Sequence, residues 1–216
     1  MKKTLFVLSV ATLFLFLGCS ATGYYILSLR EVNRPEDAKN RYGEPKIINF
    51  TEDNVKNYVY EDELIKITWY PLSTNFYFIL ENISDHSIKV IWDEAVYVNT
   101  RGVSARLVHS GVKLVDRDKT QLPTLIPKKS ILKEKILPAE NIDYVRDPMF
   151  GGYKWVISPL IPNKAESKNE LIALSKRYIG KTVRVLLPLQ IQDVTNEYIF
   201  YFNVDDFILK SNLENN

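Results

Sequence analysis

The stretch FYFILENISDHSIKVIWDEAVYVN, residues 76–99, decides the fold class of this chain. Residues 76–80 are all apolar, which predicts a central strand that is covered on both faces. Residues 82–85 have the Asn, Ser and Asp content of a turn. A second strand follows, in which apolar side chains recur at alternate positions of residues 88–92. The alternation changes phase at Asp93-Glu94, which predicts a bend or bulge that lets the strand cross between sheets.

Short alternating segments continue on both sides of this stretch, at residues 64–72, 104–109 and 130–137. Together with a closing hairpin they give seven or eight short strands joined by turns. No regular βαβ alternation occurs, which disfavours a parallel sheet. Strands of this kind can each bury one face between two packed sheets. We therefore expect a mainly β fold, an antiparallel immunoglobulin-like β-sandwich with two short peripheral helices. The alternatives are an antiparallel barrel or an α+β arrangement.

The closing hairpin is predicted from two alternating runs, residues 181–192 and 197–209, around a turn at residues 193–196. Apolar residues recur at alternate positions of both strands. They are Val183, Val185 and Leu187 on the first strand, and Tyr198, Phe200, Phe202 and Val204 on the second.

Two helices are predicted from their end signals. The first is predicted at residues 35–42. It begins with Pro35, which suits a first helical turn, and it is followed by Gly43, which suits the left-handed position after a helix. The second helix begins at a capping box, Ser167 to Glu170, and ends at Gly180. Both helices are short, so we place them at the periphery.

The charge of the chain excludes one class of partner. The 216 residues carry a formal net charge of +2, but two of the basic residues, Lys2 and Lys3, precede a long apolar run at the N-terminus. Without them the basic and acidic residues number 26 each. No basic stripe is present along the rest of the chain, and nucleic-acid binding needs one to neutralise phosphates. We expect no nucleic-acid partner.

The N-terminus has the layout of a secretory signal. Lys2 and Lys3 are followed by the apolar residues 5–17, a run too short to span a membrane comfortably, and then by Gly18 and Cys19. A small residue before a cysteine resembles the lipobox of bacterial lipoproteins. The resemblance implies removal of residues 1–18 and attachment of acyl chains to Cys19, which is the one cysteine of the chain.

The lipoprotein resemblance also implies a location. Ser20 rather than Asp follows the cysteine, so the outer membrane is the expected destination in a cell with two membranes, and no acidic run that would favour surface exposure follows it. We expect a lipid-anchored, periplasm-facing protein. Its parts are a signal peptide at residues 1–18, an anchor, tether and short helix at 19–57, and a β-sandwich at 58–216. Residues 76–137 also resemble a sandwich module of uncharacterised bacterial lipoproteins, which implies fold and location but no activity.

Residues that could support catalysis or metal binding are few. The histidines are His86, in a predicted turn, and His109, at a predicted strand end, and no HExxH or cysteine pair accompanies them. The carboxylate pairs Asp93-Glu94 and Asp205-Asp206 are neighbours on predicted strands, where successive side chains point to opposite faces. We expect no metal, no cofactor and no enzymatic activity. A hydrolase site near His109, with Ser110 beside it, is the alternative.

Five residues of a proline- and glycine-rich segment are the candidate partner-binding site: Tyr144, Met149, Phe150, Tyr153 and Trp155. Aromatic and Met side chains on a loop can anchor a partner. The alternative is that this segment folds back and buries them over one end of the sheet. The function expected from the sequence is a non-enzymatic envelope lipoprotein that binds or scaffolds another envelope protein. A module that binds a glycan or small ligand through residues 144–155 is the alternative.

Overall fold

A computed structural model describes residues 20–34, 43–52 and 55–210 of the chain. The predicted signal peptide at 1–18, the predicted lipidation site Cys19 and the predicted helix at 35–42 lie outside the described residues. Within the described ranges, no helix is long and apolar enough to cross a membrane.

The described residues are mainly β. The strands are β1 (Ala21–Asn33), β2 (Lys46–Glu52), β3 (Val55–Glu61), β4 (Ile65–Pro71), β5 (Phe76–Asn82), β6 (Ile88–Val90), β7 (Val96–Val98), β8 (Ser104–His109), β9 (Thr124–Ile126), β10 (Ile131–Pro138), β11 (Ile142–Arg146), β12 (Tyr153–Ile157), β13 (Lys164–Ala165), β14 (Thr182–Ile191) and β15 (Val194–Leu209). The helices are α3 (Lys168–Ser175) and the short 3₁₀ turns η2 (Trp92–Glu94), η3 (Leu114–Asp116) and η4 (Ala139–Asn141).

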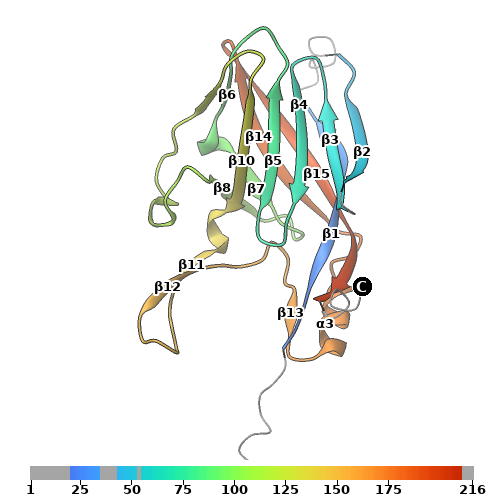
Figure 1. The fold of residues 1–216 in the computed structure, drawn as a ribbon, viewed down its shortest axis with the longest axis vertical. Helices are drawn as coiled ribbons and strands as arrows, with labels where there is room; N and C mark the ends of the chain where they lie inside the picture. Colours follow the sequence, from blue (N-terminus) through green and yellow to red (C-terminus); the bar gives the residue numbers. More distant parts are fainter. Residues whose placement is uncertain (1–19, 35–42, 53–54, 211–216) are drawn as a thin grey trace, which may run out of the picture.

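Thirteen strands form one curled antiparallel sheet. Its order is β13-β1-β15-β14-β7-β8-β10-β5-β4-β3-β2, and β6 pairs with both β14 and β9 outside this path. The curl brings β3, β4 and β5 in front of β14 and β15 (Figure 1). The indole of Trp69 on β4 accordingly lies 4.9 Å from the ring of Phe200 and 5.4 Å from that of Phe202, both on β15. The mainly β, antiparallel expectation is confirmed.

The core fills the space between the facing halves of the curled sheet. All seven of the alternating apolar side chains of the closing hairpin are buried there. The turn of that hairpin lies at Gln192 and Asp193, earlier than predicted, and Gln192 adopts φ +55°. On β5 the alternation is stricter than expected, because Phe76, Phe78 and Leu80 are fully buried while the residues between them are only partly buried. The expected cover on both faces of β5 is therefore wrong.

The sheet includes part of the segment 19–57, which was expected to be an anchor, a tether and a short helix. β1 pairs with β15 from Gly23 to Asn33, and β2 and β3 form the opposite edge of the same sheet. Of the two possibilities for residues 21–33, tether or early strand, the structure shows the strand.

The bend predicted at Asp93-Glu94 is the 3₁₀ turn η2, but the chain does not cross between sheets there. β6 and β7, on either side of η2, both pair with β14. The interruption lies opposite Pro188 of β14, whose carbonyl accepts from the Ile91 N–H at 3.0 Å. Proline has no N–H to return to a neighbouring strand, which explains why the ladder breaks at this point.

The predicted C-terminal helix is confirmed as α3, the one α-helix of the described residues. The Ser167 hydroxyl caps it by accepting from the Glu170 N–H at 3.3 Å. The helix buries Leu171 fully, and Gly180 after it has φ +83°. The helix covers the lower end of β1 (Figure 1).

Candidate functional site

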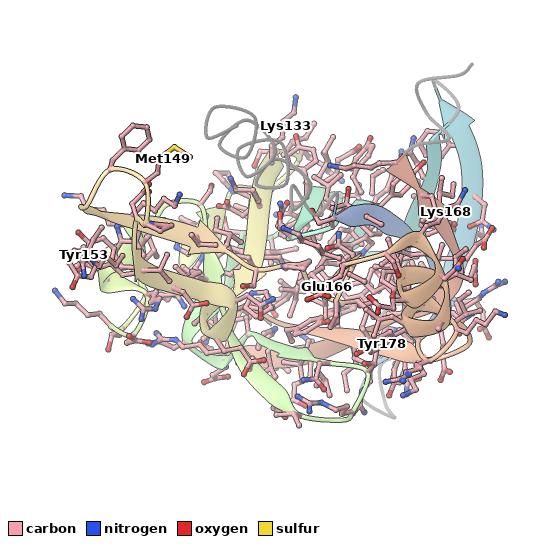
Figure 2. All side chains as sticks on the ribbon, turned by 90° about the horizontal axis from the view of Figure 1, so that it is seen from below. Lys133, Met149, Tyr153, Glu166, Lys168 and Tyr178 are labelled. Atoms are coloured by element: carbon pink, nitrogen blue, oxygen red, sulfur yellow. The ribbon has the colours of Figure 1, made fainter. Side chains whose placement is uncertain are left out.

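The five predicted partner-binding residues all lie on one β-hairpin that projects from the molecule. β11 and β12 pair only with each other among the described strands, from Ile142↔Ile157 to Arg146↔Tyr153. The hairpin extends away from the curled sheet at its lower end (Figure 1). Seen from below, Met149 and Tyr153 lie at the opposite side of the molecule from Lys168 on α3 (Figure 2).

One face of this hairpin is a ladder of aromatic rings. Tyr144 and Trp155 are directly paired across the strands, and their rings lie 4.8 Å apart. Tyr144 also stacks on Tyr153, with ring centroids 5.3 Å apart and planes 24° apart. Tyr144 and Tyr153 nevertheless remain 56% and 63% exposed. Aromatic pairs of this kind favour offset stacking, so the rings hold one another in position while leaving much of their surface open.

The tip of the hairpin presents two apolar side chains to solvent. Met149 and Phe150 are 81% and 84% exposed. The turn beneath them is ordered by Asp147, whose carboxylate accepts from the Met149 N–H at 2.9 Å and pairs with Lys154 at 3.0 Å. The backbone hydrogen bond to Met149 and the ammonium of Lys154 hold the pKa of Asp147 below its usual value. Gly151 closes the turn with φ +71°, a conformation that suits glycine.

The base of the hairpin is fixed to the body through Trp155. This ring is partly buried against a small cluster of Val108, Leu137 and Ile142, and the guanidinium of Arg117 lies 5.3 Å from its centre. The fold-back alternative therefore applies in part to Trp155. It is wrong for the other four residues, whose side chains are exposed.

The alternative site at His109 contains a carboxylate, but not in a catalytic arrangement. His109 Nδ1 lies 3.3 Å from Oε2 of Glu134, and its ring stacks on the buried Trp92 with centroids 4.6 Å apart. The hydroxyl and N–H of Ser110 both donate to the other oxygen of Glu134. A serine nucleophile needs its hydroxyl hydrogen-bonded to the histidine. Here the carboxylate takes that hydrogen bond, so the arrangement fits a structural tie between β8 and β10.

Glu134 is a carboxylate stabilised by the fold. Burial by itself raises the pKa of Glu134, but hydrogen bonds from His109, Ser110 and the Lys135 N–H outweigh it, so the pKa lies below its usual value. A lowered folded-state pKa adds stability above the unfolded pKa of about 4.3, and this stability is lost as the pH falls through the folded value.

Glu134→Gln is expected to lower the unfolding free energy at pH 7 by about 1–3 kcal/mol, because charge-assisted hydrogen bonds become neutral ones. Below the folded pKa the wild type also loses this charge, so the difference between the two proteins narrows at low pH. Urea unfolding followed by tryptophan fluorescence at pH 7 and in acid measures both effects. Glu81→Gln, at a partly exposed pair with Lys66, is the matched control with little expected effect. A difference that does not change with pH would contradict the assignment to Glu134 ionisation.

The carboxylate pairs do not converge on a ligand. Asp93 lies on η2 and pairs with Arg106, whereas Asp205 on β15 pairs with Arg30 at 3.0 Å. Asp205 falls at a register shift between β1 and β15, and hydrogen bonds offset burial to keep its pKa below the usual value. In the described part of the chain, no group of three or more His, Cys, Asp or Glu side chains could hold a metal ion.

Sequence reasoning missed a buried carboxylate, Asp62. Its Oδ2 accepts from the hydroxyls of Tyr60 at 2.9 Å and Tyr198 at 3.1 Å, and from Arg34 Nη1 at 3.2 Å. Its Oδ1 accepts from two backbone N–H groups, of Leu64 and Ile65. The side chain of Asp62 is 0% exposed and that of Arg34 7%. All its partners are internal, so Asp62 ties β3 to β15 and to the segment after β1.

Neither of two surface cavities in the described structure offers a ligand site of ordinary size. One, of about 170 Å³, lies between β1, β2, β3 and β15 and is lined by Ser28, Leu29, Arg30, Asn49, Phe50, Tyr58 and Asp205. The other, of about 10 Å³, is lined by Tyr25 and Leu160 among others. Pockets for small ligands usually enclose about 300–1,000 Å³. The projecting hairpin lines neither of these two cavities.

No protein-family model matches this chain, and no curated protein matches its sequence. It is similar to the crystal structure of the yjhA protein from Bacillus subtilis, with 13% sequence identity over 72% of this chain and 87% of that one. The TM-score of this match is 0.22, too low to support a conclusion about fold or function.

Proposed function

We propose that this chain is a non-enzymatic envelope lipoprotein that acts as a binding or scaffold module at a membrane surface. Acyl chains on Cys19 hold it there, in the outer membrane and facing the periplasm, and the β11–β12 hairpin is its contact surface. The observation that carries the proposal is the exposure of Met149 and Phe150 at the tip of an ordered hairpin. Contiguous exposed apolar side chains often mark an interaction site, and aromatic side chains frequently anchor a partner there.

The finer fold assignment belongs to the same proposal. We propose that the curled sheet is an immunoglobulin-like β-sandwich, in which Trp92 occupies the core without a disulfide. Trp92 is fully buried, and its Nε1 donates to the Thr124 hydroxyl at 2.8 Å. A buried indole with its polar atom satisfied can fill such a core alone.

A non-enzymatic role is supported by the use of the polar groups that might otherwise react. Ser110 and His109 are both engaged with Glu134, which ties two strands together. The buried Asp62 is likewise saturated by donors from the protein itself. These groups stabilise the sheet, and the exposed Met149 and Phe150 on the hairpin have no such internal role.

Photocrosslinking tests the proposal. Phe150→p-benzoylphenylalanine in the full chain is expected to yield crosslinked adducts in intact cells, because this side chain lies at the tip of the proposed contact surface and would touch the binding partner. The same chain carrying Cys19→Ala is expected to move from the membrane fraction to the soluble fraction and to lose those adducts. Fractionation and blotting measure both outcomes, and mass spectrometry of the N-terminal peptide identifies the lipid.

Asp193→p-benzoylphenylalanine is the matched control, because Asp193 is exposed in the turn between β14 and β15, at the upper end of Figure 1. It is expected to give few adducts. If the Cys19→Ala chain stays in the membrane fraction and the wild type carries no lipid, the anchor is wrong. Equal adduct yields from Phe150 and Asp193 would show that the hairpin is not the contact surface.

A further inference from the structure

The hairpin and the start of β1 lie at the same end of the molecule. The hairpin base is closed by Asn141, whose carbonyl accepts from the Ser158 N–H at 2.8 Å. The segment that follows runs to Asn163, which exchanges two hydrogen bonds with the backbone of Gly23, at 3.1 Å and 2.9 Å. In Figure 1 the tip of the hairpin and the first residues of β1 accordingly lie at the same level along the longest axis.

This placement has a consequence if Cys19 carries lipid. Ala21, the first residue of β1, is two positions from Cys19 in the sequence. An extended chain spans at most about 3.6 Å per residue, so lipid on Cys19 would keep the start of β1 within about 7 Å of the bilayer surface. The end of the molecule that carries the hairpin would then face the membrane.

The order of side chains along the hairpin matches the layers of a membrane interface. The apolar Met149 and Phe150 form the tip, Tyr153 lies in the first strand pair behind it, and Tyr144 lies in the third. Tyrosine and tryptophan are enriched at the headgroup level, where an apolar ring meets a polar boundary. The hairpin therefore presents the kind of amphipathic surface that partitions into an interface.

The polar groups of the tip are prepared for a less polar environment. The Met149 N–H and the Phe150 N–H both donate to Asp147 Oδ1, at 2.9 Å and 3.4 Å, and Asp147 N–H donates to the Gly152 carbonyl at 2.6 Å. Lys154 neutralises the carboxylate. Unpaired backbone donors are costly where water is scarce, and these donors are paired within the turn.

We infer that the tip of the β11–β12 hairpin inserts into the headgroup region of the bilayer, as a second, non-covalent contact of a chain that is already lipid-anchored. The inference rests on the proposed anchor at Cys19 and names the surface that the hairpin meets. Two contacts at one end of the domain would fix its orientation, which a single flexible lipid attachment does not.

Fluorescence quenching by brominated lipid tests the inference. The full lipidated protein carrying Phe150→Trp is reconstituted into vesicles of phosphatidylethanolamine and phosphatidylglycerol, with and without brominated acyl chains. Relative to the wild type, we expect the added indole to show a blue-shifted emission and a loss of intensity in the brominated vesicles. Met149→Trp, at the neighbouring exposed position, repeats the measurement, and Asp193→Trp, at the opposite end of the domain, should show no loss.

The outcomes separate the two proposals. If the protein floats with the vesicles but neither tip tryptophan is quenched more than Asp193→Trp, the anchor stands and the insertion of the hairpin is wrong. If the protein does not float with the vesicles, the anchor fails and the insertion fails with it. Adducts from p-benzoylphenylalanine at position 150 that contain only protein or glycan, and no lipid, would also overturn the inference.

Discussion

Replacing Asp62 with alanine is expected to lower the unfolding free energy by about 3–5 kcal/mol, because it leaves the buried Arg34 without its counter-charge. The same change removes the acceptor of the Tyr60 and Tyr198 hydroxyls. Burial raises the pKa of both tyrosines, so the hydroxyls stay protonated and need an acceptor. Urea unfolding followed by tryptophan fluorescence measures the loss.

Two further variants show whether the loss belongs to the buried charge. Asp85→Ala removes an aspartate whose side chain is 84% exposed and whose pair with Lys129 is at the surface, so little change is expected. Tyr198→Phe removes one donor only and is expected to cost about 1 kcal/mol. A loss from Asp62→Ala no larger than that from Asp85→Ala would contradict the role of Asp62 as a tie between strands.

Replacing Trp69 with alanine is expected to cost about 3–5 kcal/mol, the range for removing a large aromatic ring from a core. The indole is fully buried and contacts Phe76 and Phe78 on β5 as well as Phe200 and Phe202 on the facing strand. Its loss opens a cavity where the two halves of the curled sheet meet. The measurement is the shift of the urea midpoint at constant slope.

Trp155→Ala is the matched control for Trp69, because it removes the same ring from the small cluster at the hairpin base. We expect it to cost less than half as much and to leave the main core intact. Trp69→Phe is a second test. The Nε1 of Trp69 is buried without a hydrogen-bond partner in the described structure, so phenylalanine loses volume but no hydrogen bond. Equal losses for Trp69→Ala and Trp155→Ala would contradict the central position of Trp69.

Local patterns in the sequence predict only part of the strands and of their arrangement, because seven or eight strands were expected and fifteen are described. The alternation in the closing hairpin identifies seven buried side chains correctly, because a strand places every second residue on one face. The capping box at Ser167 likewise predicts α3 from chemistry within four residues. These features depend on neighbours along the chain, so one sequence is enough to find them.

Other features depend on contacts between distant residues. Asp62 precedes a strand in a stretch with several acidic residues, and nothing local indicates that Tyr198, 136 residues away, completes its site. The pairing of β1 with β15 is equally remote from any local pattern. For the candidate site, the residue types at 144–155 indicated a contact surface. Whether this segment projects or folds back depends on β11 and β12 pairing only with each other, which the residue types do not reveal.

The pairing of β1 with β15 also sets an order of events for the chain. Among the described strands β1 comes first along the chain and β15 last, and ten residues of β1, between Gly23 and Asn33, pair with residues between Ile199 and Leu209. Contacts so distant in sequence form late, because the entropy of closing a long loop is lost before these contacts add any stabilising energy. A chain that lacks its last twenty residues would leave the apolar side chains of β1 and one long edge of β14 uncovered. β1 therefore reaches its final pairing only after β15 has been synthesised, and it must avoid mispairing with other strands until then.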